Sequence, residues 1–161
     1  MSTPSCGHLE SQGDALVKDL LKLEKFDEFA ANLQCIDDED MRFEYIIEIG
    51  KKADGASFPD VMKVDTNLMH GCMSKVWIID RIEDGRHYFN GFSDAIIVQG
   101  LVTMMTKSFS GLTGEELNTL NEKHVRKLNL GALTTQRQLG MLAMLEHLQK
   151  LGRRETAATA N

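Results

Sequence analysis

The segment VWIIDRIEDGRHYFNGF, residues 76–92, constrains the fold more than any other part of the chain. Asp84 and Gly85 form the dipeptide that is most favoured at a two-residue β-hairpin turn. An apolar, β-branched run at 76–79 precedes this turn, and the aromatic run HYFNGF at 87–92 follows it. The sequence therefore predicts two antiparallel strands joined at 83–86, and a sheet built from that hairpin.

Helical patterns lie on both sides of the hairpin. Residues 14–33 repeat leucine at helical spacing, and the acidic residues 37–40 begin a second pattern that places Phe43, Ile46, Ile47 and Gly50 on one face. Ser93 is expected to cap a third helix that runs to about Lys107 and is apolar nearly all round, as in a buried helix. TGEE at 113–116 has the capping-box pattern. TQRQ at 135–138 begins a last helix, whose inward side chains are expected to be Leu139, Leu142, Leu145 and Leu148. We predict an α+β fold with a small antiparallel sheet packed against several helices.

The 161 residues are enough for one domain. Residues 1–13 and 152–161 lack apolar periodicity, and we expect them to form a flexible N-terminal arm and a flexible tail around a single domain at 14–151. The net charge of −6 argues against binding to nucleic acid or to anionic membranes. The chain shows no apolar run long enough to cross a membrane, and its first residues lack the pattern of a signal peptide.

Three cysteines stand far apart, at positions 6, 35 and 72. An odd, widely spaced set indicates free thiols in a reducing compartment, which predicts a cytoplasmic protein. Cys72 follows Gly71, which permits a turn, and the nearby His70 and Lys75 would favour the reactive thiolate. Free cysteine is also among the most buried residue types, so the spacing alone leaves a reactive thiol and a core thiol both open.

Other kinds of site have weaker support in the sequence. No Cys-x-x-Cys or His-x-x-x-His pair offers the ligand spacing of a zinc site, and no Walker, dinucleotide or Gly-x-Ser-x-Gly motif occurs. Asp94 is expected in the first turn of the third helix, where the helix dipole alone explains a carboxylate. Arg137 is expected in the first turn of the last helix, where a cation is slightly unfavourable and a salt bridge or a site contact is therefore indicated.

Four segments, taken in order between Arg42 and Leu148, resemble motifs of the SufE-type cysteine desulfuration proteins. These segments are RFEYIIEIGKK, HGCMSKVWI, FSDAIIVQGLV and the pair SFSGLTGEEL with LNLGALTTQRQLGMLAML. The resemblance implies the two-layer SufE/IscU-like fold. It also implies that these proteins accept sulfur from cysteine desulfurases, which use pyridoxal phosphate.

The resemblance places the family's sulfur-accepting cysteine on Cys72. It places the family's acidic residue near that cysteine on Asp94 and its basic residue on Arg137. The remaining residues of the implied active-site loop are His70, Gly71, Met73, Ser74, Lys75 and Trp77. The chain departs from the family pattern at Met73, where glutamine is usual, at Gln99, where a basic residue is common, and at Gln138 and Leu139.

The implied function is that of a persulfide carrier. Cys72 would take sulfur from a cysteine desulfurase, stimulate that enzyme and pass the sulfur to an iron–sulfur cluster assembly scaffold, with no cofactor or metal of its own. We expect a sulfur-transfer partner rather than a stand-alone enzyme, with the 68–75 loop covering Cys72 until the partner docks. Two alternatives stay open: an iron–sulfur or zinc scaffold with several ligands, and a Cys–His hydrolase with His70 or His124 as base.

Overall fold

The computed structural model describes residues 23–53, 58–71, 74–128 and 135–159, and for residues 154–159 it describes the helix backbone alone. Helices α2 (Glu24–Cys35) and α3 (Glu39–Ala53) come first, followed by two short 3₁₀ turns, η2 (Asp60–Met62) and η3 (Asp65–Asn67). The strands β1 (Val76–Glu83) and β2 (Arg86–Ser93) lead into α4 (Ile96–Phe109). The chain ends with β3 (Leu112–Thr113), α5 (Gly114–Asn118), α6 (Glu122–Arg126) and α7 (Thr135–Thr159).

The predicted hairpin is confirmed. β1 and β2 pair antiparallel from Val76 opposite Ser93 to Glu83 opposite Arg86. Asp84 and Gly85 both have positive φ, at 54° and 76°, which is the backbone of the favoured two-residue turn. The short strand β3 adds to the other edge of β2, so the sheet has three antiparallel strands in the order β1-β2-β3.

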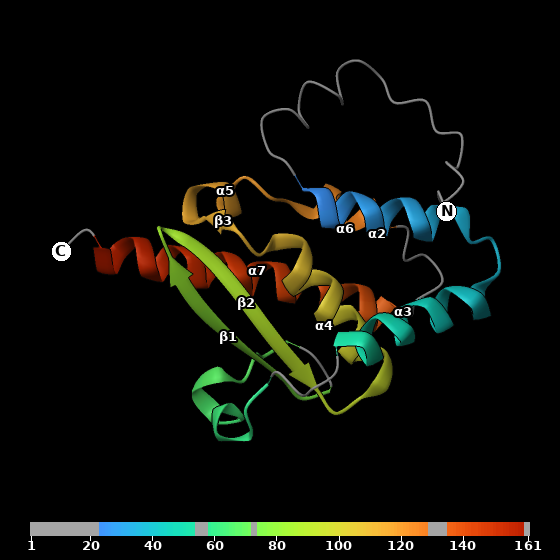
Figure 1. The fold of residues 1–161 in the computed structure, drawn as a ribbon, viewed down its shortest axis with the longest axis horizontal. Coiled ribbons are helices and arrows are strands. Elements are labelled where there is room, and N and C mark those ends of the chain that lie inside the picture. Colours follow the sequence, from blue (N-terminus) through green and yellow to red (C-terminus); the bar gives the residue numbers. More distant parts are fainter. Residues whose placement is uncertain (1–22, 54–57, 72–73, 129–134, 160–161) are drawn as a thin grey trace, which may run out of the picture.

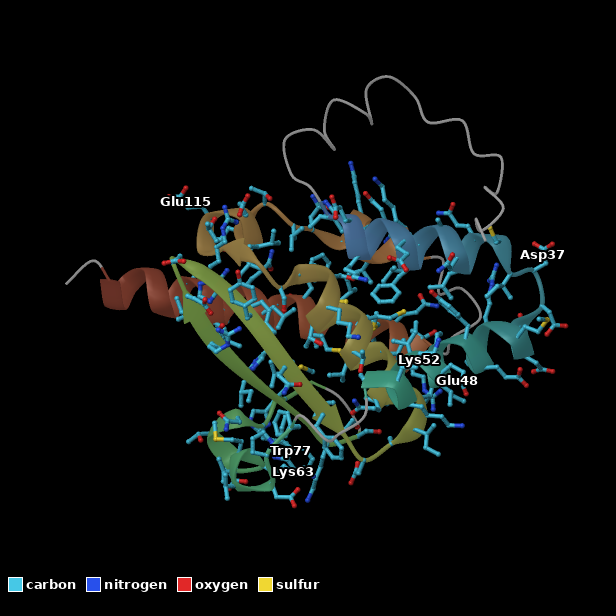
Figure 2. All side chains as sticks on the ribbon, viewed as in Figure 1. Asp37, Glu48, Lys52, Lys63, Trp77 and Glu115 are labelled. Atoms are coloured by element: carbon cyan, nitrogen blue, oxygen red, sulfur yellow. The ribbon has the colours of Figure 1, made fainter. Side chains whose placement is uncertain are left out.

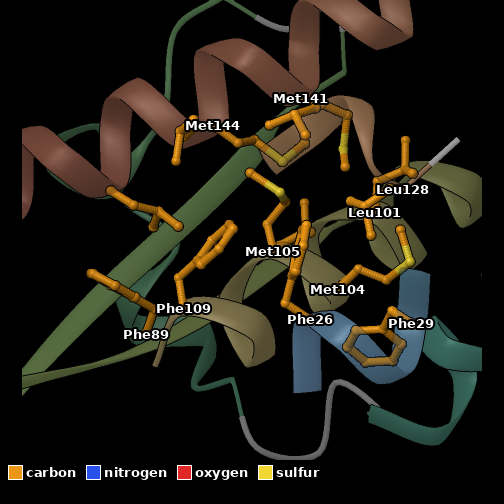
Figure 3. Packing of buried hydrophobic residues seen from close by; sticks show 14 of the residues in the cluster. Phe26, Phe29, Phe89, Leu101, Met104, Met105, Phe109, Leu128, Met141 and Met144 are labelled. Atoms are coloured by element: carbon orange, nitrogen blue, oxygen red, sulfur yellow. The ribbon is translucent and has the colours of Figure 1, made fainter. Parts of the chain in front are cut away.

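Helix α4 lies at the centre of the molecule, as its apolar sequence predicts. It packs against β2 on one side and against α2, α3 and α7 on the others, so the fold is a small sheet with helices beside it (Figure 1). Methionines from α4 and α7 meet in the core, together with the stacked rings of Phe26 and Phe109, whose centres are 5.7 Å apart (Figure 3). The α+β prediction is confirmed.

The last helix differs from its prediction in the side chains that it buries. Leu139 is 57% exposed, whereas Leu145 and Leu148 are buried together with Met141 and Met144. Leu139 and Leu148 are nine residues apart, which places them on opposite faces of a helix with 3.6 residues per turn. The helix also continues to Thr159, so residues 152–159 have a helical backbone.

Gly152 lies inside α7, where it contacts α5. A Cβ atom on Gly152 would lie 2.9 Å from Leu117 Cδ1, so this glycine allows α5 to approach α7 and does not end the helix.

Cys35, at the end of α2, is disulfide-bonded, so the expectation of a free thiol is wrong for Cys35. The capping box at 113–116 is confirmed, because Thr113 and Glu116 each accept the other's backbone N–H. The described residues include no helix that is both long and apolar enough to span a membrane.

Candidate functional site

The segment 58–70 folds over the outer face of the hairpin, at the end where β1 begins. The ring of Phe92 on β2 packs against two others: its centre is 6.0 Å from that of Phe58 and 6.2 Å from that of Trp77 on β1. Lys63 Nζ stands 3.8 Å from the centre of the Phe92 ring, in cation–π contact. Figure 2 shows Lys63 and Trp77 together at this end of the sheet. The segment is therefore anchored beside the start of β1.

Backbone pairing then closes the predicted active-site loop. The Met69 N–H donates to the Val76 carbonyl over 2.8 Å, and Leu68 forms an antiparallel bridge with Trp77. Residues 70–75 lie between these paired positions in the chain. Cys72 and Met73 lie outside the described residues.

Gly71 fixes the position of this loop against α7. Its φ of +106° belongs to the region that favours glycine, and a Cβ atom on it would lie 2.9 Å from the Cβ atom of Ala143. Both observations explain why glycine precedes Cys72. Ala143 was not predicted as a site residue, because its contact with the loop depends on how α7 packs and has no local sequence signal.

The other described residues of the loop differ in their exposure. His70 and Lys75 are exposed, Ser74 is half-buried, and Trp77 is half-buried on the outer face of β1. The imidazole of His70, before Gly71 in the chain, and the ammonium group of Lys75, after it, are therefore both exposed to solvent.

The turn between β2 and α4 places Asp94 beside the strand end that follows the loop. Ser93 is the last residue of β2 and pairs with Val76, and the exposed Asp94 comes directly after it. The helix begins at Ile96 with Ala95 as its N-cap residue, so the prediction that Ser93 caps the helix is wrong, and Asp94 lies before the first turn. The Ser93 hydroxyl instead accepts the N–H of Ala95 over 3.3 Å.

Gln99 also belongs to this turn, although the sequence marked it only as a departure from the family pattern. Its Oε1 atom accepts the Ser93 N–H over 2.7 Å. A side chain in the first turns of α4 therefore holds the backbone that carries Asp94.

Arg137 is the third residue of α7 and is half-buried, which confirms its predicted place in the first turn. The same helix provides Ala143, against which Gly71 packs. The structure therefore places Gly71 against α7, and it pairs Val76, which follows the loop, with Ser93, which precedes Asp94. Among the residues that the structure describes, no three histidine, cysteine or acidic side chains form a group that could hold a metal ion.

Comparison with known proteins shows the family of this chain. The family described as "SufE: Fe-S metabolism associated domain" matches residues 27–152, which is most of the chain. This chain belongs to the SufE family. An uncharacterized SufE-like protein from Rhizobium meliloti is 30% identical over 129 residues, which are 76% of this chain and 91% of that protein. The cysteine desulfuration protein SufE of Wigglesworthia glossinidia brevipalpis is 29% identical over 128 residues, covering 78% and 88% of the two chains.

A solved structure shows the same fold. The solution structure of a hypothetical protein from Thermus thermophilus superimposes with a TM-score of 0.67 at 18% sequence identity. The match covers 83% of this chain and 96% of that protein. The SufE-type fold implied by the sequence motifs is thus confirmed.

Proposed function

We propose that this protein accepts sulfur from the persulfide of a cysteine desulfurase on Cys72 and passes it on for iron–sulfur cluster assembly. The observation that carries the proposal is membership of the SufE family, in which a relative at 29% identity is named a cysteine desulfuration protein. Cys72 belongs to the HGCMSKVWI segment and lies in the chain between Met69 and Val76, whose backbones are hydrogen-bonded.

The transfer is an exchange reaction that needs no oxidant. Cys72 attacks as the thiolate on the outer sulfur of the donor persulfide. A bond forms between Cys72 Sγ and that sulfur, while the bond between the two donor sulfurs breaks and its electron pair leaves with the donor cysteine as a thiolate. Arg137 supplies a cation that favours the Cys72 thiolate. Asp94 accepts the proton that Cys72 loses, and this proton then neutralises the departing donor thiolate.

The surroundings of the loop support docking of a protein donor. Among the described residues, seven large apolar side chains are exposed: Val61 and Met62 in η2, Val64 before η3, Ile96 at the start of α4, Leu139 in α7, and Met41 and Ile82 elsewhere. The first five stand on segments that precede the loop, follow β2 or belong to the helix that Gly71 contacts. Val61 is 80% exposed and Ile96 is 66% exposed, so both apolar side chains are accessible to a partner. We propose that this surface faces the desulfurase.

The remaining parts of the proposal concern the partners. The pyridoxal phosphate belongs to the desulfurase, and the carrier contributes only its thiol and the groups around it. By accepting sulfur, the carrier frees the desulfurase cysteine for the next cycle and so stimulates turnover. We propose that both proteins act in the cytoplasm and that an assembly scaffold receives the sulfur.

The proposal is tested by transfer of labelled sulfur. The desulfurase is incubated with pyridoxal phosphate and sulfur-labelled cysteine, together with either the unmodified chain or its Cys72→Ser variant. Label on the unmodified chain alone supports the proposal, and equal label on both chains contradicts it. Stoichiometric metal that is bound by the purified protein and lost on Cys72→Ser would instead support the scaffold alternative.

A further inference from the structure

The turn that carries Asp94 is held on both of its sides by hydrogen bonds. On one side, Gln99 Oε1 accepts the Ser93 N–H over 2.7 Å. On the other side, Ser93 Oγ accepts the Ala95 N–H over 3.3 Å. Asp94 lies between these two bound amides with its own side chain exposed. The direction of its carboxylate therefore depends on a turn whose first N–H is fixed by Gln99.

Gln99 is itself fixed within α4. Its Nε2 atom donates to Thr103 Oγ1 over 3.3 Å, and that hydroxyl donates to the Gln99 carbonyl over 2.8 Å. Thr103 is only 3% exposed, so this anchor lies in the interior. The amide of Gln99 thus bridges a buried threonine and the end of β2.

The backbone of Gln99 is fixed as well, by the crossing of α3 over α4. A Cβ atom on Gly50 of α3 would lie 3.1 Å from the carbonyl carbon of Gln99 and 2.8 Å from the nitrogen of Gly100. This contact leaves the start of α4 little freedom to shift. The side chain of Gln99 therefore spans two positions that are both held by the core.

We propose that Gln99 is a positioning residue that acts through Asp94 in sulfur transfer. This inference rests on the proposed function, because it assigns Gln99 a part in the reaction of Cys72. Glutamine suits this place because its amide has an acceptor oxygen for the Ser93 N–H and a donor nitrogen for Thr103. An apolar side chain of similar length has neither, and a lysine has no acceptor.

The test compares Gln99→Met with Gln99→Glu, which keeps an acceptor for the Ser93 N–H. The rate of sulfur transfer from a desulfurase persulfide to Cys72 is measured over a range of carrier concentrations. We expect Gln99→Met to lower the saturated rate about fivefold, the effect of losing one hydrogen bond, with an unchanged half-saturating concentration. Gln99→Glu restores most of the rate. A saturated rate for Gln99→Met equal to that of the unmodified chain overturns the inference.

Two further measurements separate positioning from general damage. In the Asp94→Asn background, Gln99→Met should have no additional effect on the rate, whereas an equal effect in both backgrounds contradicts action through Asp94. Gln149→Met is the matched control, because Gln149 Nε2 also joins a helix to backbone carbonyls, those of Leu117 and Leu120, at 3.0 and 2.8 Å. We expect this control to keep the full transfer rate, and an equal loss of rate in it contradicts a special role for Gln99.

Failure of the inference can be told apart from failure of the proposed function. If Cys72 accepts no sulfur from the desulfurase, the proposed function is wrong and the role of Gln99 in it falls too. If Cys72 accepts sulfur but the rate is insensitive to Gln99, only the inference is wrong. Hydrogen exchange of the Ser93 amide reports on the contact without any partner, and it should speed up in Gln99→Met and stay slow in Gln99→Glu. Equal exchange in all three chains overturns the inference.

Discussion

Gly100 of α4 lies against Ile46 of α3 so closely that a Cβ atom on Gly100 would stand 2.1 Å from the Ile46 carbonyl oxygen. This contact sets how α3 crosses the start of α4, the part of the helix that follows Asp94. Neither backbone can move aside without disturbing its helix, because both sit in the packed interior.

We therefore predict that Gly100→Ala lowers the free energy of unfolding by about 1–3 kcal/mol, the usual cost of overpacking, despite the better helix propensity of alanine. Denaturant titration of both chains measures the change. Gly152→Ala is the matched control, since its Cβ atom would meet the end of the Leu117 side chain at 2.9 Å and no backbone atom nearer than Gly114 Cα, at 3.3 Å. It should cost clearly less. A Gly100→Ala variant as stable as the unmodified chain would show that the two helices are not locked together.

The contact between Gly71 and Ala143 gives a second prediction. Ala143→Leu places a larger side chain where the Gly71 backbone now packs, at a separation that already excludes a Cβ atom on Gly71. If the loop covers Cys72 at rest, the larger side chain displaces it, and alkylation of Cys72 speeds up on the order of tenfold, as expected for overpacking of this size. Peptide mass spectrometry after timed alkylation follows the reaction. Ala143→Gly adds no volume and should show no such increase, and an unchanged rate in Ala143→Leu would count against a covered thiol.

His124 gives a prediction for the dependence of stability on pH. Burial is the main cause that holds the pKa of His124 below its usual 6.5; the nearby Lys127 lowers this pKa further, and the carboxylate of Asp27 partly opposes the shift. The ring packs against Phe26, with centres 6.1 Å apart, and Nδ1 accepts the N–H of Asn121 over 3.1 Å. Because the unfolded chain takes up this proton at a higher pH than the folded chain, the free energy of unfolding falls as the pH drops below about 6.5.

The contribution of His124 to this pH dependence is isolated with His124→Gln, which keeps an acceptor for the Asn121 N–H. Unfolding free energies of the two chains are compared at about pH 8 and about pH 5.5, on either side of the ordinary histidine pKa. The unmodified chain should lose more stability on acidification than the variant. Equal losses would mean that the proton affinity of His124 is the same in the folded and unfolded chains.

Features with a local cause could be predicted from the sequence. The turn at Asp84 and Gly85 and the capping box at 113–116 both follow from a few adjacent residues, and both are confirmed. The central position of α4 could also be predicted from the sequence, because a helix that is apolar nearly all round has to be buried. The family motifs indicated the fold in the same way.

Features that depend on distant contacts could not be predicted. Ser93 has a capping side chain, but β2 extends through it and its N–H is bound by Gln99. The close packing of α5 against Gly152 has no local signal in the sequence. The positions of Gly71 beside Ala143 and of Asp94 beside the start of β1 likewise depend on how the helices and the sheet come together.

The central claim, that Cys72 carries sulfur, is tested most directly by mass spectrometry. The protein is incubated with a cysteine desulfurase, pyridoxal phosphate and cysteine, and both its intact mass and its peptide masses are then measured without reduction. The account predicts a gain of about 32 Da, one sulfur atom, located on the peptide that contains Cys72. No gain, or a gain located only on peptides without Cys72, would contradict it.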